Sequence, residues 1–436
     1  MRFRYSAEEN GRPVKKAVVY TQDEHKIKFS DVDSQAVYIT ERLQANGYET
    51  YIVGGAVRDL ILGKKPKDFD IVTAASPIKI KKIFRNARVI GRRFRLVHVF
   101  FGPKIFEVST FRSMKDGPTS NTFGTIEEDV LRRDFSLNAL FYDPLKQIVV
   151  DYVGGMKDIR KRLIRPIIAL PRIFTDDPVR MIRAIKYGAV TGFRLPLSLK
   201  WKIRRQSGLL AGISPSRLTE EIFKIIHSPH ALEIVEGLDA LGLYCYLQPG
   251  ASELFRSDPG FKSRYLKTMG TLNTETLNGA ASPLNEGAGS LPGQALSALI
   301  RDYLEDTADW DGTRGGNQEI PPAERYKSAF ILARKFVLPM NPPRMELDAA
   351  LRLLFAGHGV SVKKARFSER RPRISRSAPP DRLTPAGKPA DAGKSAPAEE
   401  KRTDMPPPAA DGTPAKRRRK RKKRTSTEKE SGAGHF

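Results

Sequence analysis

Hydrophobic and polar positions in the first 160 residues follow two different periods. Across residues 31–45, apolar residues recur at helical spacing, which predicts a helix. Apolar runs at 48–53 and 69–73 predict strands, and residues 96–111 alternate around a Gly-Pro turn, which predicts a hairpin. Short helices are expected between these strands. The pattern therefore predicts an α/β unit with a small mixed sheet.

After residue 170 the strand patterns fade and helical spacing dominates. Residues 272–293 are low in aromatic residues and rich in Gly, Asn and Ser, which predicts a flexible loop between helices. From residue 363 onward Pro, Ala, Lys and Arg are abundant and large apolar residues are few, which predicts disorder. The expected helices cover residues 177–190, 198–207, 215–227, 231–241, 294–304, 322–336 and 344–355.

Charge is the dominant global property of the chain. Its 436 residues include 76 Lys and Arg against 49 Asp and Glu, a formal net charge of +27. Such a charge favours polyanions, and nucleic acid is the commonest of these. A solubilising surface is the alternative interpretation. Part of the charge lies in the C-terminal run at 416–424 (KRRRKRKKR), which we expect to bind RNA through Lys416, Arg417, Arg418, Arg419, Lys420 and Arg421.

Other compositional features limit the location and the kind of site. Cys245 is the only cysteine, which excludes an internal disulfide and favours a reducing compartment. The six histidines are scattered, which argues against a zinc site. The sequence shows no apolar run of membrane-spanning length and no apolar signal segment at its start. We therefore expect a cytoplasmic protein.

Two aspartates, Asp68 and Asp70, flank Phe69 on the second predicted strand. Alternate side chains of a strand share a face, so both carboxylates are expected on one face and Phe69 in the core. Paired carboxylates suit Mg²⁺, and two such ions can activate an attacking hydroxyl and stabilise a leaving pyrophosphate. Glu107, on a neighbouring predicted strand, is either a third carboxylate of this site or a solvent-facing residue. A D-x-D pair alone more often consists of exposed polar residues of a strand that have no role in a site.

Gly54 and Gly55 follow the first predicted strand and open a short helix that carries Arg58. Glycine lets backbone amides approach a phosphate, and a helix N-terminus offers free N–H groups. Arg58 could reach triphosphate oxygens with its paired donors. A bare pair of glycines is usually a tight turn, but strand, glycines, arginine and D-x-D in this order favour phosphate binding. The pattern matches neither a P-loop nor a dinucleotide fingerprint.

A second polar cluster, RRDFSLNA, occupies residues 132–139 just before an apolar run. Its arginines could neutralise a triphosphate and Asn138 could orient it. Asp134 could fix an arginine or support the metal ions. A surface salt bridge at a helix start is the alternative interpretation.

A third cluster, DDPVRMIR, occupies residues 176–183. Asp177 and Arg180 are three positions apart, so they are expected on one helix face beside a proline suited to the first turn. An acceptor beside a donor could hydrogen-bond a base edge. Taken alone, the cluster is more often a helix cap with a salt bridge.

Together these motifs resemble the class II nucleotidyltransferases, the family of bacterial poly(A) polymerases and CCA-adding tRNA nucleotidyltransferases. The family's motifs appear in order as GGAVRD, DFD, RRDFSLNA and DDPVRMIR, with Asp176 where the family commonly has Glu. Residues 91–101, 106–112 and 151–158 resemble the poly(A) polymerase branch most. The resemblance implies a polymerase-beta-like α/β head with a small mixed sheet, then all-α neck and body domains and a disordered basic tail.

The resemblance also implies roles for individual residues. Asp68 and Asp70 would bind two Mg²⁺ ions, Asp134 would be catalytic, and a role for Glu107 as a further metal ligand stays open. Three of the nucleotide-binding residues, Asp177, Arg180 and Arg183, would recognise the base. The residues implied to bind ATP are Gly54, Gly55, Arg58, Arg133, Asn138, Asp177, Arg180 and Arg183.

We accordingly expect five regions along the chain. They are a flexible N-terminus (1–24), a catalytic head (25–160), a helical neck that binds nucleobase and RNA (161–230), a helical body that binds RNA (231–362), and a disordered basic tail (363–436).

The expected function is template-independent addition of AMP from ATP to an RNA 3′-hydroxyl, with release of pyrophosphate. CCA addition to tRNA is the alternative, because both branches share the catalytic residues. A non-catalytic RNA-binding protein on a transferase scaffold is a third possibility, which the intact Asp68, Asp70 and Arg58 argue against.

Overall fold

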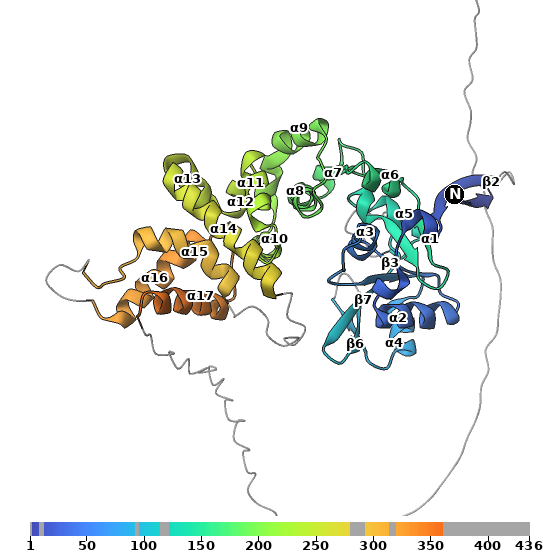
Figure 1. Ribbon diagram of the computed structural model, residues 1–436, viewed down its shortest axis with the longest axis horizontal. Helices are drawn as coiled ribbons and strands as arrows, with labels where there is room; N and C mark the ends of the chain where they lie inside the picture. The colour runs from blue at the N-terminus through green and yellow to red at the C-terminus, as the bar shows by residue number, and fades with distance from the viewer. Residues whose placement is uncertain are drawn as a thin grey trace, which may run out of the picture. The chain divides into compact units, whose positions relative to one another are not determined.

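The computed structural model of the protein (Figure 1) describes residues 2–7, 13–91, 96–113, 122–279, 293–313 and 320–360. Within these residues, nine strands form one sheet, and every element after the last strand is a helix. A mixed-sheet head followed by helices confirms the predicted fold class. The predicted disordered tail (363–436), with its RNA-binding residues from Lys416 to Arg421, lies outside the described residues.

The sheet has the strand order β1-β2-β9-β8-β3-β4-β7-β6-β5. Strands β4 and β7 run parallel, and the other described pairs are antiparallel. The strands are β1 Arg2–Ala7, β2 Pro13–Tyr20, β3 Thr50–Val53, β4 Asp70–Thr73, β5 Ala87–Ile90, β6 Leu96–Phe101, β7 Lys104–Thr110, β8 Leu140–Asp143 and β9 Ile148–Asp151.

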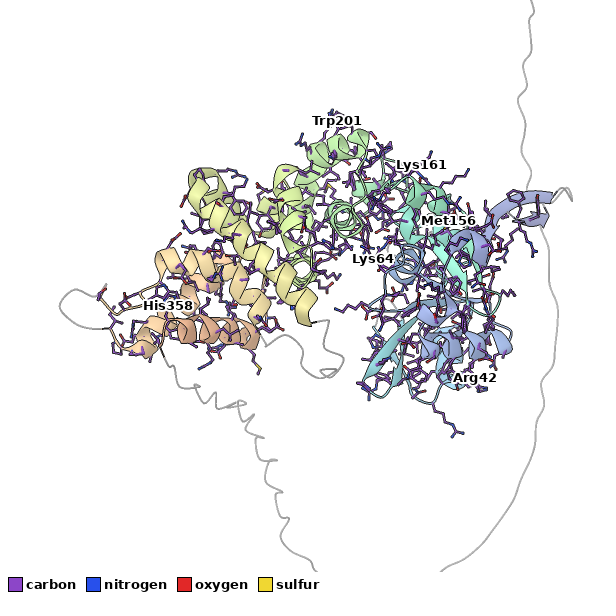
Figure 2. The ribbon with its side chains drawn as sticks, viewed as in Figure 1. Arg42, Lys64, Met156, Lys161, Trp201 and His358 are labelled. Carbon is purple, nitrogen blue, oxygen red and sulfur yellow. The ribbon has the colours of Figure 1, made fainter. Side chains whose placement is uncertain are left out.

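Every residue of the central strand β3 is buried, and three of the four, Tyr51, Ile52 and Val53, are hydrophobic. Alternation places Ile52 in one hydrophobic cluster, and Tyr51 and Val53 in the other. Met156, labelled in Figure 2, belongs to the same cluster as Ile52. Because β3 and β4 are antiparallel, the residues that follow β3 and those that precede β4 lie at the same end of this packed strand pair.

Helices account for most of the described residues outside the strands, and none of them is long and apolar enough to cross a membrane. They are α1 Gln22–His25, α2 Ser34–Ala45, α3 Gly55–Ile61, α4 Pro77–Ile83, α5 Ile126–Leu131, α6 Gly155–Arg160, α7 Ile173–Asp176, α8 Val179–Thr191, α9 Leu197–Gln206, α10 Pro215–Ile226, α11 Ala231–Ala240, α12 Tyr244–Leu247, α13 Pro249–Ser257, α14 Pro259–Gly279, α15 Gln294–Thr307, α16 Pro322–Phe336 and α17 Arg344–Gly357.

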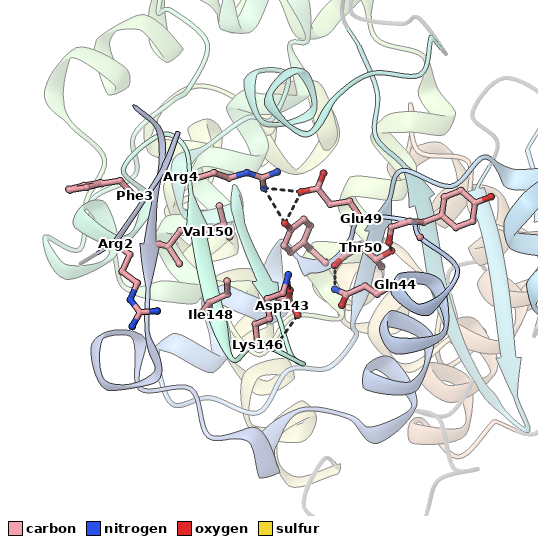
Figure 3. Close-up of a pocket in the computed structure, with 14 residues that line it drawn as sticks. Arg2, Phe3, Arg4, Gln44, Glu49, Thr50, Asp143, Lys146, Ile148 and Val150 are labelled. Carbon is pink, nitrogen blue, oxygen red and sulfur yellow. Dashed lines mark hydrogen bonds and ion pairs between the residues drawn. The ribbon is translucent and has the colours of Figure 1, made fainter. Parts of the chain in front are cut away.

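Within residues 1–24, expected to be a flexible N-terminus, the described residues 2–7 and 13–24 contain two strands and the start of a short helix. Strand β1 pairs with β2, and β2 pairs with β9 at the sheet edge. Figure 3 shows the side-chain contact that joins β1 to the start of β3: Arg4 Nη1 donates to Glu49 Oε1 at 2.8 Å and to Tyr51 Oη at 3.2 Å. These partners are distant in sequence, so a local polar pattern does not reveal them.

The predicted loop at 272–293 is also partly wrong. Helix α14 continues to Gly279, and residues 280–292 lie outside the described residues. Leu272 is buried against the helical core, so tertiary packing stabilises a segment whose composition favours a loop.

Candidate active site

A recessed pocket of about 740 Å³ opens where the turn after β3 meets β4, β7, α8 and α10. Every predicted site residue within the described part of the chain lines it. These residues are Gly54, Gly55, Arg58, Asp68, Asp70, Glu107, Arg133, Asp134, Asn138, Asp177, Arg180 and Arg183. By contrast, none of them lines the pocket of about 640 Å³ beside β1 that Figure 3 shows.

The turn after β3 needs glycine at its first position. Gly54 caps α3 with φ +72° and ψ −133°, a conformation that residues with a Cβ avoid. A Cβ there would stand 3.8 Å from Asp70 Oδ2, an ordinary contact, so the requirement comes from the backbone and not from crowding. The turn brings the start of α3 directly beside a carboxylate of β4.

Three carboxylates meet on one side of the pocket. Asp70 begins β4, and Glu107 lies on β7, which pairs in parallel with β4 so that Ile71 faces Val108. Asp68 lies on the loop just before β4 and not on the strand itself, and it lines the same pocket as Asp70, as expected for two carboxylates on one side.

The carboxylate of Asp70 has an altered pKa. Asp70 is open to the solvent of the pocket, but the protein around it is dense, and this burial is the largest cause that raises its pKa to about 6. The charges of Glu107 and Asp68 raise that pKa further, while Arg133 lowers it. Carboxylates that repel one another in this way favour a cation between them.

The donor set fits Mg²⁺ with substrate phosphates completing its coordination. Among the described residues, no three His, Cys, Asp or Glu side chains form a cluster that could hold a metal ion alone. Protein sites for Mg²⁺ commonly supply only one or two carboxylates and leave the other positions to water and phosphate. Asp68 and Asp70 as the metal ligands therefore stay a prediction.

Arg58 faces the carboxylates from α3. It is buried, and its Nε donates to Asp59 Oδ1 at 2.8 Å while Nη1 donates to Asn138 Oδ1 at 3.0 Å. Its guanidinium lies 5.7 Å from the centre of the Tyr187 ring. The side chain of Asn138 thus orients an arginine, in addition to lining the pocket.

Arg133 is fixed in a similar way. Its Nε and Nη2 donate to Asp129 Oδ2 at 3.1 and 2.9 Å, and Nη1 donates to the backbone oxygen of Asn138 at 3.0 Å. Asp129 is fully buried, and burial favours its neutral form, but Arg133 and Arg132 outweigh this and lower its pKa. Asp129 lies on α5, three residues before the 132–139 cluster, and was not among the residues predicted from the motifs.

Asp134 connects the head to α8. It is buried and accepts from the backbone N–H of Phe135 at 2.8 Å and from Arg183 Nε at 2.7 Å. Arg183 also donates to the hydroxyl of Tyr187 at 2.7 Å. The structure thus shows Asp134 holding an arginine, which is one of the two roles expected for it, and that arginine is Arg183.

Asp177 lies before α8 and not on it, so the expectation of one shared helix face with Arg180 is wrong. Pro178 is the N-cap and the helix begins at Val179. Asp177 Oδ1 accepts from the N–H of Val179 at 3.1 Å, and Oδ2 accepts from Arg217 Nη2 at 2.6 Å. Both carboxylate oxygens therefore have donors at the pocket wall.

Arg180 is anchored by backbone carbonyls. Its Nη1 donates to the oxygen of Ile173 at 3.1 Å and Nη2 to the oxygen of Arg132 at 3.4 Å. Burial lowers its pKa, while Asp177 and Asp134 raise it. Because these hydrogen-bond partners are neutral carbonyls, they do not cancel the charge of Arg180, which can act on a ligand in the pocket.

Two lysines that the motif analysis missed complete the wall. Lys186 Nζ and Lys224 Nζ lie 3.1 and 2.9 Å from the two carboxylate oxygens of Glu221, which is buried. Burial would raise the pKa of Glu221, but the two lysines outweigh this and lower it. Lys186 follows Arg183 on α8 at helical spacing, so the motif could have indicated it. Lys224 lies on α10, so the motif on α8 gives no sign of it.

Comparison with known proteins agrees with this arrangement. Residues 50–165 match the poly A polymerase head domain, and residues 192–255 match the probable RNA and SrmB-binding site of polymerase A. The chain is 40% identical over 274 residues to poly(A) polymerase I of Escherichia coli O6:H1, covering 59% of each chain. Over these residues the chain is thus similar to the family of bacterial poly(A) polymerases and CCA-adding enzymes.

Both branches of this family are represented among its relatives. The chain is 40% identical over 225 residues to the CCA-adding enzyme of Geobacillus thermodenitrificans, covering 50% of this chain and 55% of that protein. A solved structure described as a tRNA-processing enzyme has the same fold, with a TM-score of 0.52 and 22% identity over 75% of this chain and 80% of that one. The chain thus spans little more than half the length of these curated relatives.

Proposed function

We propose that the protein transfers AMP from ATP to the 3′-hydroxyl of RNA without a template. The observation that carries this proposal is one pocket that Asp68, Asp70 and Glu107 line together with Arg58 and Arg133. Carboxylates suit the metal ions of nucleotidyl transfer, and guanidinium groups suit a triphosphate. The match to the poly A polymerase head domain and the similarity to poly(A) polymerase I support the same reaction class.

The reaction is an in-line displacement at phosphorus. The 3′-oxygen of the RNA forms a bond to the α-phosphorus of ATP, the bond from that phosphorus to its bridging oxygen breaks, pyrophosphate leaves, and the hydroxyl proton passes to solvent. Two Mg²⁺ ions held by Asp68 and Asp70 would supply charge stabilisation at both oxygens. Arg58 and Arg133 offset the triphosphate charge, and each is already held in place by hydrogen bonds.

Base recognition is proposed for the opposite wall of the pocket. Asp177 can accept a hydrogen bond from an exocyclic amine, and Arg180 can donate to a ring or carbonyl acceptor. Both side chains line the pocket with Arg183, which is held by Asp134 and Tyr187. Selection of the base by protein groups would replace selection by a template.

CCA addition is a second candidate. Cytosine carries an exocyclic amine as adenine does, so the same acceptor serves both bases, and a CCA-adding enzyme is 40% identical to half of this chain. The 40% identity to poly(A) polymerase I spans a larger share, 59%, and favours AMP addition.

RNA is the proposed partner of the helices that follow the head. Residues 192–255 match a family model described as a probable RNA-binding site, and the chain carries a net charge of +27. We propose that residues 161–230 contact the nucleobase and RNA, that residues 231–362 guide RNA, and that the basic tail adds salt-sensitive affinity.

A primer-extension assay separates these functions. Purified protein with Mg²⁺ receives ATP alone, CTP alone or both, together with either generic RNA or tRNA that lacks its 3′ end. Long A-tails on generic RNA are the expected result. A stop after C-C-A on tRNA would establish the second candidate, and no incorporation with RNA binding intact would establish a non-catalytic RNA-binding protein.

A further inference from the structure

A second groove, of about 880 Å³, adjoins the candidate active site. It is formed by the residues before α2, the loop between α3 and β4, and the turn between β6 and β7. Asp68 lines both this groove and the active-site pocket. On β7, Ile105 and Phe106 line the groove, and the next residue, Glu107, lines the pocket. The two hollows therefore meet at the carboxylates.

The groove lies on a definite side of those carboxylates. In the sheet order β3-β4-β7, the turn with Gly54 stands on one side of Asp70, and Glu107 stands on the other. An in-line displacement places the attacking hydroxyl opposite the leaving pyrophosphate. If the triphosphate lies over the glycine turn, the attacking strand approaches from the side of β7, where the groove opens.

Four lysines line the groove, and three of them are exposed on the loop between α3 and β4. Lys64 donates to the backbone oxygen of Val190 at 3.2 Å, which holds the loop against the end of α8 (Figure 2). Lys65 and Lys67 are exposed beside it, two positions apart. Such a row of ammonium groups is suited to successive phosphates of a single strand.

The groove also contains three acidic residues, which offset part of this charge. Asp33 Oδ2 pairs with Lys104 Nζ at 3.3 Å, and its Oδ1 accepts from the N–H of Gln35 at 2.8 Å, so these two charges offset each other. Asp31 is the other acid of the groove besides Asp68, which faces the active site. Ile105 is 52% exposed and gives a base an apolar surface.

We propose that this groove binds the RNA nucleotides immediately upstream of the 3′-hydroxyl, with Lys65 and Lys67 contacting their phosphates. This inference rests on the proposed function and names the path by which its RNA substrate reaches Asp68. The bound strand would lie along the loop between α3 and β4, with its 3′ end at the carboxylates.

Charge removal on the loop tests the proposal. The double variant Lys65→Gln/Lys67→Gln is compared with Lys79→Gln/Lys81→Gln on α4, which removes the same charge, at the same spacing, from exposed positions on the head that line neither hollow. The loop variant should raise KM for RNA at least about fivefold and lower the salt slope of RNA binding by about one or more, with kcat and KM for ATP unchanged. Equal shifts in both variants, or none, would overturn it.

Crosslinking provides a readout that does not depend on catalysis. RNA with 4-thiouridine as its penultimate nucleotide is irradiated with the full-length parent, and the crosslinked peptides are mapped. Crosslinks within 63–69 or 103–106 are expected, and crosslinks confined to residues after 160 would contradict the groove assignment. Crosslinks at the loop without AMP incorporation would refute the proposed function and leave the RNA path standing.

Discussion

Arg183 Nε lies 2.7 Å from Asp134 Oδ2 and joins helix α8 to the sheet-bearing head. The carboxylate is buried, and its other oxygen is held by a backbone N–H. Burial would lower the pKa of Arg183, but Asp134 outweighs this and raises it, so the guanidinium stays charged. The contact fixes the helix that brings Lys186 and Tyr187 to the pocket wall.

Asp134→Asn should lower the free energy of unfolding by about 1–3 kcal/mol, because it leaves a charged hydrogen-bond donor without its ionic partner. Arg183→Gln and the double variant complete a thermodynamic cycle in urea unfolding. A coupling energy of about 1 kcal/mol or more is expected. Additive losses in the double variant would show that the two residues act independently.

Asp70→Asn should make the metal-free protein more stable at pH 7–8. The pKa of Asp70 is raised from 3.8 to about 6. Between these two pH values the folded state binds more protons than the unfolded state, so stability falls as the pH rises and the full loss is present at pH 7–8. The asparagine removes this penalty, and the difference from the parent should vanish near pH 4.

Urea midpoints in EDTA and in Mg²⁺ measure this effect. Mg²⁺ should stabilise the parent at pH 7–8, because the cation needs the ionised carboxylate, and should stabilise the variant much less. A variant that is less stable than the parent in EDTA at pH 8 would contradict the assigned environment of Asp70.

Gly54→Ala should cost about 1–3 kcal/mol of stability and most of the activity, because alanine is strained at φ +72° and ψ −133°. Gly47→Ala is the matched control: Gly47 has φ +81°, no atom lies within 4 Å of its added Cβ, and it lies outside the active-site pocket. The control should lose stability and keep its kcat. Equal losses of kcat in both variants would indicate a general effect of instability.

Arg217→Gln should raise KM for ATP several-fold and reduce discrimination against CTP, since Arg217 fixes one oxygen of Asp177 at 2.6 Å. Because the arginine is half exposed, the loss of stability should stay below about 1 kcal/mol. Arg217→Lys should restore part of the effect. Steady-state kinetics with each nucleotide give the measurement, and an unchanged ratio of ATP to CTP efficiency would remove Arg217 from base selection.

The sequence predicts most helices, the central strands and the residues of the pocket, because these follow local spacing and ordered motifs. Helix α16 occupies the predicted residues, and the hairpin of β6 and β7 lies where alternation placed it. Strand β1 was missed because its polar sequence lacks an apolar run; it pairs with β2 as a hairpin and contacts the distant Glu49 through Arg4.

The pairing of site residues was harder to predict than their presence. Asp177 and Arg180 share a motif, yet Asp177 bonds to Arg217 on α10. Glu221 contacts Lys224 of its own helix at i,i+3 spacing, but it also contacts Lys186 of α8, and no spacing within one segment shows that second contact. Local motifs identify polar groups; the packing of helices decides which groups meet.

The most direct test of the account is primer extension by Asp68→Asn and Asp70→Asn, each shown to be folded. Asparagine keeps the shape of aspartate and removes the charge that would bind Mg²⁺. Each variant should add AMP to RNA at least about 10³-fold more slowly than the parent, a loss of about 4 kcal/mol in transition-state stabilisation. Extension at the parental rate by either folded variant would contradict the central claim that these carboxylates carry the reaction.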